Sequence, residues 1–170
     1  NKYILNGVFR QSGASQLAAG NKWGFFPAVS AAWIVSNEDF LKDVSAISEL
    51  KLRGGWGKTG NLSGLPAYSS FDLNYTNPLT NATTLDQIGN SDLKWERTHQ
   101  IDLGFDLSLW DRLNITFDYY TRRTTDMLYN VPIPTTSGFS SILSNVGEVK
   151  NNGYEFTIGG RVIDRNFKLD

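Results

Sequence analysis

The clearest pattern along the chain is the alternation of apolar and polar residues between Trp95 and Leu109. Most odd positions are apolar, and the even positions are polar apart from Gly104. Because successive side chains of a strand point to opposite faces, this period of two predicts a strand with one apolar and one polar face. The alternation restarts at Leu113 after a short turn at 110–112, which predicts an antiparallel hairpin.

The predicted turn also determines which residues would oppose one another across this hairpin. A turn centred on Asp111 fixes the register of the two strands, which places pairs of opposed polar residues on one face and pairs of opposed apolar residues on the other. The predicted couples are Asp102 with Tyr120, Gln100 with Arg122, Leu103 with Tyr119 and Phe105 with Phe117. The polar face is expected to meet water. Periodicity alone leaves open whether the apolar face meets lipid or the core of a sandwich.

Other segments are predicted to be strands with less contrast between their faces. Alternation occurs at 2–10, 50–58 and 154–162, and 23–35 carries aromatic and small residues on both faces. Six long strands are therefore predicted, and a seventh is expected to begin near Phe167. In the segment 50–58, apolar or glycine positions are set against basic ones: Leu50, Leu52, Gly54 and Trp56 against Lys51, Arg53 and Lys58.

The connections between these strands alternate in length. Long polar loops are predicted at 11–22, 60–93 and 130–144, and tight links at 36–49, 110–112 and 164–166. An antiparallel meander places successive connections at opposite ends, so every long loop is expected at one end. This sorting is typical of outer-membrane barrels, which have short periplasmic turns and long external loops.

Strand length supports the same interpretation. The segments 94–109 and 113–128 each cover 16 residues, whereas a strand of a globular protein usually has about 5 to 6. Crossing the hydrocarbon takes about 9 to 11 tilted residues. The surplus is expected to project into the external loops.

A short helix is predicted at 37–46, inside the first tight link. Ser36 or Asn37 can accept a backbone N–H as the N-cap, and Glu38 and Asp39 would lie in the positive first turn. Three apolar residues then fall on one stripe, as expected for a short helix at a structural corner.

Composition narrows the possible functions. Aromatic residues make up 13% of the 170 residues and there are 16 glycines, a mixture that favours strands and turns. The 16 basic and 17 acidic residues are interspersed, which argues against a nucleic-acid partner. With no cysteine and the single histidine His99, the sequence offers no thiolate or multi-histidine metal site. The most apolar window, 25–35, is too short for a spanning helix.

The candidate chemistry does not indicate an enzyme. Asp102 and Asp106 would stand about 13 to 14 Å apart along one strand, beyond the roughly 5 to 9.5 Å between the carboxylates of glycosidases. No combination of nucleophile, base and orienting residue can be assembled. We therefore predict no catalytic residue, no metal ligand and no cofactor.

Some polar and aromatic residues fit a membrane boundary. Arg97 and His99 occupy odd positions near Trp95 and are therefore expected on the apolar face. If that face were packed into a protein core, burial of these two polar side chains would be unfavourable. Five aromatic residues near predicted strand ends match an aromatic girdle: Trp23, Trp56, Trp95, Trp110 and Tyr129. The rim of a soluble sheet would give a similar pattern. A secreted β-sandwich that binds carbohydrate through tryptophan and tyrosine rings is therefore kept as the alternative.

Several segments together resemble the SusC/RagA-type TonB-linked outer-membrane proteins of Bacteroidetes. They are NKWGFFPAVSAAW at 21–33, ISELKLRGGWGKTGN at 47–61, NSDLKWE at 90–96, LNITFDYYTRRTTDML at 113–128, VPIPTTSGF at 131–139 and NVGEVKNNGYEF at 145–156. They occur in order and span nearly the whole chain. The sequence departs from the family where it reads Arg10-Gln11-Ser12-Gly13-Ala14-Ser15, and where Ser91 replaces a proline.

This resemblance implies an all-β fold, namely an antiparallel transmembrane β-barrel segment with about six to seven strands of a barrel of about 22. Residues 1–170 would belong to the barrel domain of a TonB-dependent receptor, with the plug domain absent from this chain. The location would be the outer membrane, where the barrel contacts lipid. By resemblance, the function would be TonB-dependent import of large nutrients, either glycan oligomers or peptides. A SusD-like surface lipoprotein would be the partner, and TonB-ExbB-ExbD would act through the missing N-terminal part.

Within such a barrel, the polar face would line the lumen and the apolar face would meet lipid. Lipid-facing residues are expected to include Leu103, Phe105, Ile115 and Phe117. The candidates for the substrate path are Arg53, Glu96, Gln100, Asp102, Asp118, Tyr120 and Arg122.

Overall fold

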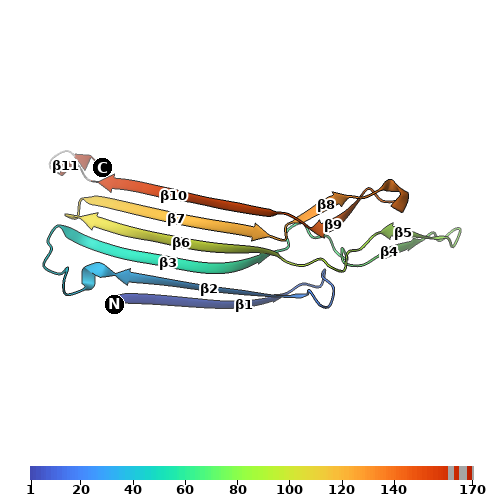
Figure 1. Cartoon of the computed structure of the whole chain (residues 1–170), viewed down its shortest axis with the longest axis horizontal. Coiled ribbons are helices and arrows are strands. Elements are labelled where there is room, and N and C mark those ends of the chain that lie inside the picture. The colour runs from blue at the N-terminus through green and yellow to red at the C-terminus, as the bar shows by residue number, and fades with distance from the viewer. Residues whose placement is uncertain (161–162, 165–167, 170) are drawn as a thin grey trace.

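The computed structural model describes residues 1–160, 163–164 and 168–169, and its long strands form one extended antiparallel sheet (Figure 1). The sheet has six strands in the order β1-β2-β3-β6-β7-β10. Their bounds are Tyr3–Gly13, Trp23–Ile34, Ile47–Asn61, Glu96–Leu109, Leu113–Thr125 and Glu148–Gly160. Each strand pairs with the next long strand along the chain, so the sheet is a meander with open edges at β1 and β10. The predicted all-β fold of antiparallel strands is confirmed.

The hairpin of β6 and β7 has the register that the turn at Asp111 predicted. Leu109 opposes Leu113, and the structure contains all four predicted couples: Asp102 with Tyr120, Gln100 with Arg122, Leu103 with Tyr119 and Phe105 with Phe117. Trp110 and Asp111 have positive φ angles of 53° and 51°, and Arg112 donates its backbone N–H to Leu109. This is the geometry of a type I′ turn, which matches the twist of paired strands.

The long loops contain two additional hairpins that the sequence did not predict. Strands β4 (Leu73–Thr76) and β5 (Thr83–Gln87) pair within the loop predicted at 60–93. Strands β8 (Leu128–Pro132) and β9 (Ser141–Asn145) pair within the next long loop, around the short 3-10 helix η2 at Thr135–Ser137. Both hairpins extend beyond the same end of the sheet, opposite the links at 36–49 and 110–112, which confirms the predicted sorting for these connections (Figure 1). Most of the tight link predicted at 164–166 lies outside the described residues.

The final pair of strands follows β10. Strand β11 (Ile163–Asp164) pairs with β12 (Lys168–Leu169). The predicted start of a seventh long strand near Phe167 lies outside the described residues. Among the described residues, no helical segment has the length and apolar character needed to cross a bilayer.

The predicted helix at 37–46 is wrong. A 3-10 helix, η1, occupies Val35–Asn37, and the chain then continues through successive turns. Backbone N–H groups of Glu38, Leu41 and Val44 each donate to the carbonyl three residues earlier. Three-residue hydrogen bonds of this kind define turns and 3-10 geometry, whereas an α-helix needs bonds that span four residues.

The Glu38 side chain explains why the helix does not form. Its carboxylate accepts hydrogen bonds from Lys2 Nζ at 2.9 Å, from the Tyr3 hydroxyl at 2.8 Å and from Trp33 Nε1 at 3.1 Å. The hydrogen bonds from these three groups, with that of Lys2 the strongest influence, hold the pKa of Glu38 below its ordinary value. Glu38 is thereby fastened to the ends of β1 and β2, and its extended backbone cannot continue a helix.

Most of the buried apolar residues gather at the loop end, and the others among the described residues are Phe26 in β2 and Val35 in η1. Ala14, Leu17, Leu65 and Leu93 form this loop-end core, and Leu17 and Leu93 are fully buried. Asn145 fastens the same region, since its amide nitrogen donates to the carbonyls of Lys94 and Asp126 and its oxygen accepts from the Lys94 N–H.

The sheet itself has no second layer among the described residues. Large apolar side chains on it remain open, including Leu5 at 78%, Phe9 at 79% and Phe156 at 62% exposure. The rings of Phe105 and Phe117 stack on one another at 5.7 Å within one face of the sheet. The alternative of a β-sandwich, which required a second sheet over these rings, is therefore wrong.

We predict that Leu93→Ala loosens the loop end in the full-length protein. Removing a fully buried leucine side chain costs about 2 to 5 kcal/mol because it leaves a cavity. Hydrogen exchange should accelerate in residues 14–22 and 62–95 while the long strands stay protected. The matched control is Leu79→Ala, because Leu79 is 91% exposed. Equal exchange in both variants would contradict the assignment of a loop-end core.

Candidate functional site

The strand register assigns every residue of the sheet to one of two faces. Directly opposed residues share a face, so Gly104, which opposes both Arg53 and Asp118, places those two side chains on the same side. We call this side the polar face. All seven predicted path residues lie on it: Arg53, Glu96, Gln100, Asp102, Asp118, Tyr120 and Arg122.

The opposite side is called the apolar face. Its middle is almost continuously apolar across the six strands, and its members include Leu5, Phe9, Val29, Leu52, Leu103, Phe105, Ile115, Phe117, Phe156 and Ile158. The four residues that were predicted to face lipid are among them.

Arg53 is the centre of a charge cluster on the polar face. Its guanidinium contacts Asp118 at 2.6 Å and Asp106 at 3.2 Å. Thr116 donates its hydroxyl to Asp106 at 3.3 Å, and Lys51 approaches the same carboxylate at 4.0 Å. These five residues form the Arg53 cluster, which joins strands β3, β6 and β7. Its charged side chains are a quarter to a third exposed, so the attraction is only partly screened by water.

Gly104 makes the contact between Arg53 and Asp118 possible. It lies between them on β6, where a side chain would occupy the space in which they meet. A Cβ at this position would stand 2.3 Å from an Asp118 carboxylate oxygen and 2.8 Å from the Phe117 carbonyl oxygen. The missing side chain therefore allows an ion pair to span two strand spacings.

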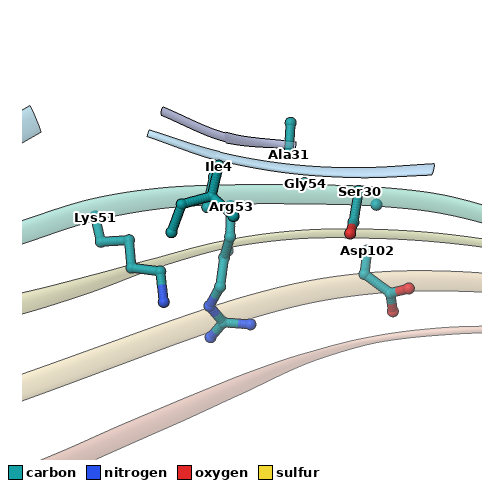
Figure 2. Close-up of a pocket in the computed structure, with 10 residues that line it drawn as sticks. Ile4, Ser30, Ala31, Lys51, Arg53, Gly54 and Asp102 are labelled. Atoms are coloured by element: carbon teal, nitrogen blue, oxygen red, sulfur yellow. The ribbon is translucent and has the colours of Figure 1, made fainter. Parts of the chain in front are cut away.

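A groove lies beside the Arg53 cluster, where β2 and β3 carry small residues. It encloses about 340 Å³, and its floor includes Ser30 and Gly55, which oppose each other. Figure 2 shows Arg53 and Asp102 extending from the strands on the same side as Ser30. A second depression of about 220 Å³ lies next to it and includes Gln100. Small residues thus form a hollow with charged and amide groups at its border.

The other predicted path residues form a more open polar group. Gln100 donates its side-chain amide to Asp102 at 2.9 Å. Tyr120 opposes Asp102, and its ring lies over Gly153, since a Cβ there would be 2.7 Å from the Tyr120 hydroxyl oxygen. Arg122 is exposed beside Gln100. These side chains offer both hydrogen-bond donors and acceptors to the space over the polar face.

Glu96 has a structural role at the loop end. One carboxylate oxygen accepts from the Asn61 side-chain amide and the other from the Leu128 backbone N–H, both at 2.8 Å. It therefore joins β3 and β6 to the start of β8. Both of its oxygens are already engaged by the protein, and one of them accepts from a backbone N–H group of a loop-end strand.

Asp126 is a second anchor at the loop end. Its carboxylate accepts from Arg97 Nε at 2.9 Å and contacts Lys94 Nζ at 3.0 Å. Burial raises the pKa of Asp126, but hydrogen bonds from Arg97 and Lys94 outweigh that effect and leave the pKa below its ordinary value.

Two details of the predicted faces need correction. Lys58 lies two residues after Trp56 and opposes His99, so it belongs to the apolar face and not with Lys51 and Arg53. Trp95 does not form part of an exposed girdle. Its ring packs edge-on against Phe26 at 5.3 Å, and its Nε1 donates to the Lys22 carbonyl.

Other residues of the Arg53 cluster and of the tight-link end could not be found from the sequence alone. Asp106 and Thr116 had the polar parity, but their contact with Arg53 depends on the register of three strands. Tyr3 and Trp33 stack at 6.2 Å near the tight links, with their polar atoms bonded to Glu38. With the exposed Trp110, they place amphipathic rings at that end of the sheet.

Comparison with known proteins assigns the family. Residues 3–170 match the family model described as TonB dependent receptor-like, beta-barrel. The chain belongs to the TonB-dependent receptor β-barrel family. It is 41% identical to TonB-dependent receptor P3 of Formosa agariphila, over 96% of the chain and 17% of that relative. It is 33% identical to TonB-dependent receptor SusC of Bacteroides thetaiotaomicron, over 100% of the chain and 18% of that relative.

Solved structures share the arrangement of strands seen in this chain. The RagAB peptide importer in the closed-closed state matches with a TM-score of 0.86 and 29% identity, over 98% of this chain and 19% of that chain. The siderophore receptor PirA from Pseudomonas aeruginosa shares the fold alone, with a TM-score of 0.59 and 16% identity, over 91% of this chain and 28% of that chain. The chain thus spans less than a fifth of the length of the curated relatives named above, and it is a segment of an outer-membrane barrel.

We predict that Gly104→Ala destabilises the full-length receptor. The added methyl group would overlap an Asp118 oxygen and the Phe117 carbonyl, and such overpacking costs about 1 to 3 kcal/mol. The expected result is a lower thermal unfolding midpoint in detergent. Gly159→Ala is the matched control, because Gly159 lies on the same face and a methyl group there would have no atom within 4 Å. A Gly104→Ala midpoint equal to that of the control would contradict the role of Gly104.

We also predict that the loop end loosens in acid because Asp126 becomes protonated. A carboxyl group whose pKa is lowered by folding stabilises the fold above its unfolded pKa of about 3.8, and this contribution is lost as the pH falls through the lower folded pKa. Hydrogen exchange around 126–128, corrected for its intrinsic pH dependence, should increase below pH 3.8. Asp126→Asn should remove this pH dependence, whereas Asp92→Asn on the exposed loop should retain it.

Proposed function

We propose that this chain forms part of the wall of an outer-membrane transporter that imports large nutrients, either glycan oligomers or peptides. The observation that supports this most strongly is the division of a single-layer sheet into an exposed apolar face and a polar face that carries the groove. A closed barrel built from such strands presents its apolar face to lipid and its polar face to an aqueous lumen. The relatives named as TonB-dependent receptors support energy-driven uptake as the activity.

The height of the apolar face suits a bilayer. From Ile101 to Leu109 the strand covers about 27 Å, or about 20 Å along the membrane normal at the usual tilt of barrel strands. Outer-membrane barrels carry an apolar band about 25 Å tall. Tyr3 and Trp33 at the tight-link end and Trp56 toward the loops place amphipathic rings near the two borders of this band.

The polar face supports transport of an uncharged or mixed-charge cargo. The charges of the Arg53 cluster are already paired with each other, so cargo would meet mainly the groove and the open side chains of Gln100, Asp102, Tyr120 and Arg122. The hydroxyl, amide and peptide groups of a cargo molecule can give up their hydrogen bonds to water and form hydrogen bonds to these side chains instead. We assign no catalytic role to the carboxylates of the polar face. The proposed substrate path consists of the groove and the side chains of Gln100, Asp102, Tyr120 and Arg122.

The proposed partners act at opposite ends of the wall. The hairpins β4–β5 and β8–β9 extend from the loop end and carry exposed Tyr75, Leu79 and Tyr129, a suitable surface for a SusD-like lipoprotein. The similarity to SusC and to the RagAB importer supports this partner. TonB-ExbB-ExbD would supply energy through a plug domain outside these 170 residues.

Single-cysteine labelling can test the orientation of the wall in a full-length protein freed of any other cysteine, and residues 1–170 contain none. In the full-length protein in bilayers, spin labels at Leu103 and Phe117 should be accessible to oxygen dissolved in lipid. Labels at Gln100 and Arg122 should instead be accessible to a water-soluble paramagnetic reagent. Leu103 and Phe117 shielded from lipid would overturn the barrel-wall proposal.

Transport itself can be tested with labelled oligosaccharides and peptides in cells that express the full-length protein. We predict uptake of at least one of these classes, and loss of that uptake when either this gene or TonB is deleted. Glu155→Gln on the polar face of β10, away from the groove, is a matched control for an Asp102→Asn variant, whose uptake should fall several-fold. Uptake that is equal with and without the gene would contradict the proposed function.

A further inference from the structure

A row of basic side chains crosses the apolar face near its loop end. Lys58 of β3 opposes His99 of β6, His99 opposes Arg123 of β7, and Arg123 opposes Lys150 of β10. Because directly opposed residues share a face, all four side chains lie side by side on the same surface. We call Lys58, His99, Arg123 and Lys150 the basic row.

The positive charge of the basic row is only partly balanced by the protein. Glu148 forms a two-bond ion pair with Arg123, with both contacts at 2.7 Å. Arg97 lies on the same face one step nearer the loops and is paired with Asp126. Across the described residues, no ion pair joins Lys58 or Lys150 to an acidic side chain. Like charges placed across neighbouring strands repel one another, so this row favours binding of an external anion.

The height of the basic row matches the outer border of the apolar band. It lies ten residues above Leu109 on β6, about 34 Å along the strand and about 26 Å along the membrane normal at the usual tilt. Trp56 and Ile101 occupy the next position down, and apolar residues continue below them. The basic row therefore falls where the hydrocarbon of the external leaflet ends and its headgroups begin.

We propose that the basic row binds the phosphate groups of an anionic lipid of the external leaflet. The row spans three strand spacings, or about 14 Å, which is wide enough for two phosphate groups. Lysine and arginine side chains bind phosphate through charge-assisted hydrogen bonds, and His99 can add a further donor. The apolar surface directly below would hold the acyl chains of the same molecule, which a free phosphate ion could not use.

This inference rests on the outward orientation of the apolar face in the proposed function and adds a specific lipid ligand to it. It also explains why basic residues interrupt an otherwise apolar surface. Positive side chains at a membrane surface are attracted to anionic headgroups.

The test uses the full-length protein in detergent, titrated with bis-phosphorylated lipid A and followed by native mass spectrometry. The variant K58Q/K150Q removes the two cations that lack an ion pair and leaves the pair of Arg123 with Glu148 intact. The control K42Q/R112Q removes the same charge from the tight-link end, where Lys42 and Arg112 are exposed. We expect K58Q/K150Q to bind lipid A roughly 30-fold more weakly, and the control to bind it like the wild type.

Two further arms identify the source of the phosphate. Lipid A stripped of its phosphates should bind the wild type as weakly as the intact lipid binds K58Q/K150Q, and inorganic phosphate at the same concentration should not displace the intact lipid. Unchanged binding by K58Q/K150Q, equal losses in both double variants, or displacement by inorganic phosphate would each overturn the proposal. If the spin labels show the apolar face open to lipid while K58Q/K150Q binds normally, only the basic-row proposal fails and the barrel wall stands.

Discussion

The structure depends on the pairing of backbone N–H and C=O groups between neighbouring strands. In hydrocarbon, an unpaired backbone group costs several kcal/mol, so the sheet, whose edges at β1 and β10 are open, is stable in a membrane only within a closed wall. The same pairing lines side chains up across several strands, so residues far apart in sequence can meet. The Arg53 cluster depends on this alignment, because Gly104 leaves an opening through which Arg53 reaches Asp118.

Much of the fold could be predicted from the sequence because its main signals are local. The alternation on either side of Asp111 was enough to predict the whole β6–β7 register, and loop lengths predicted the two ends of the sheet. The helix prediction at 37–46 failed because Lys2, Tyr3 and Trp33, most of them distant in sequence, hold the Glu38 carboxylate. The loop hairpins were missed because their strands are short and lie within long polar segments.

The candidate sites could be predicted only in part, for the same physical reason. Parity correctly placed all seven path residues on one face, but it could not show that Glu96 is engaged by Asn61 and Leu128 while Gln100 remains open. Lys58 was placed on the wrong face because a basic residue was assumed to follow the polar parity. At a membrane border that assumption fails, since a cation on the lipid-facing side can meet anionic headgroups.

The two faces differ in how far their positive side chains are neutralised by carboxylates. On the polar face, Arg53 is neutralised by Asp106 and Asp118. In the proposed transporter this would leave the wall to bind cargo through uncharged hydrogen-bonding groups as well as ions. On the apolar face, Glu148 forms an ion pair with Arg123, and in the proposed barrel wall the remaining positive charge of the basic row would be directed toward the membrane. A lysine in this row would be unfavourable in hydrocarbon a few residues lower, so in the proposed barrel wall its position would mark the level at which the strand leaves the lipid.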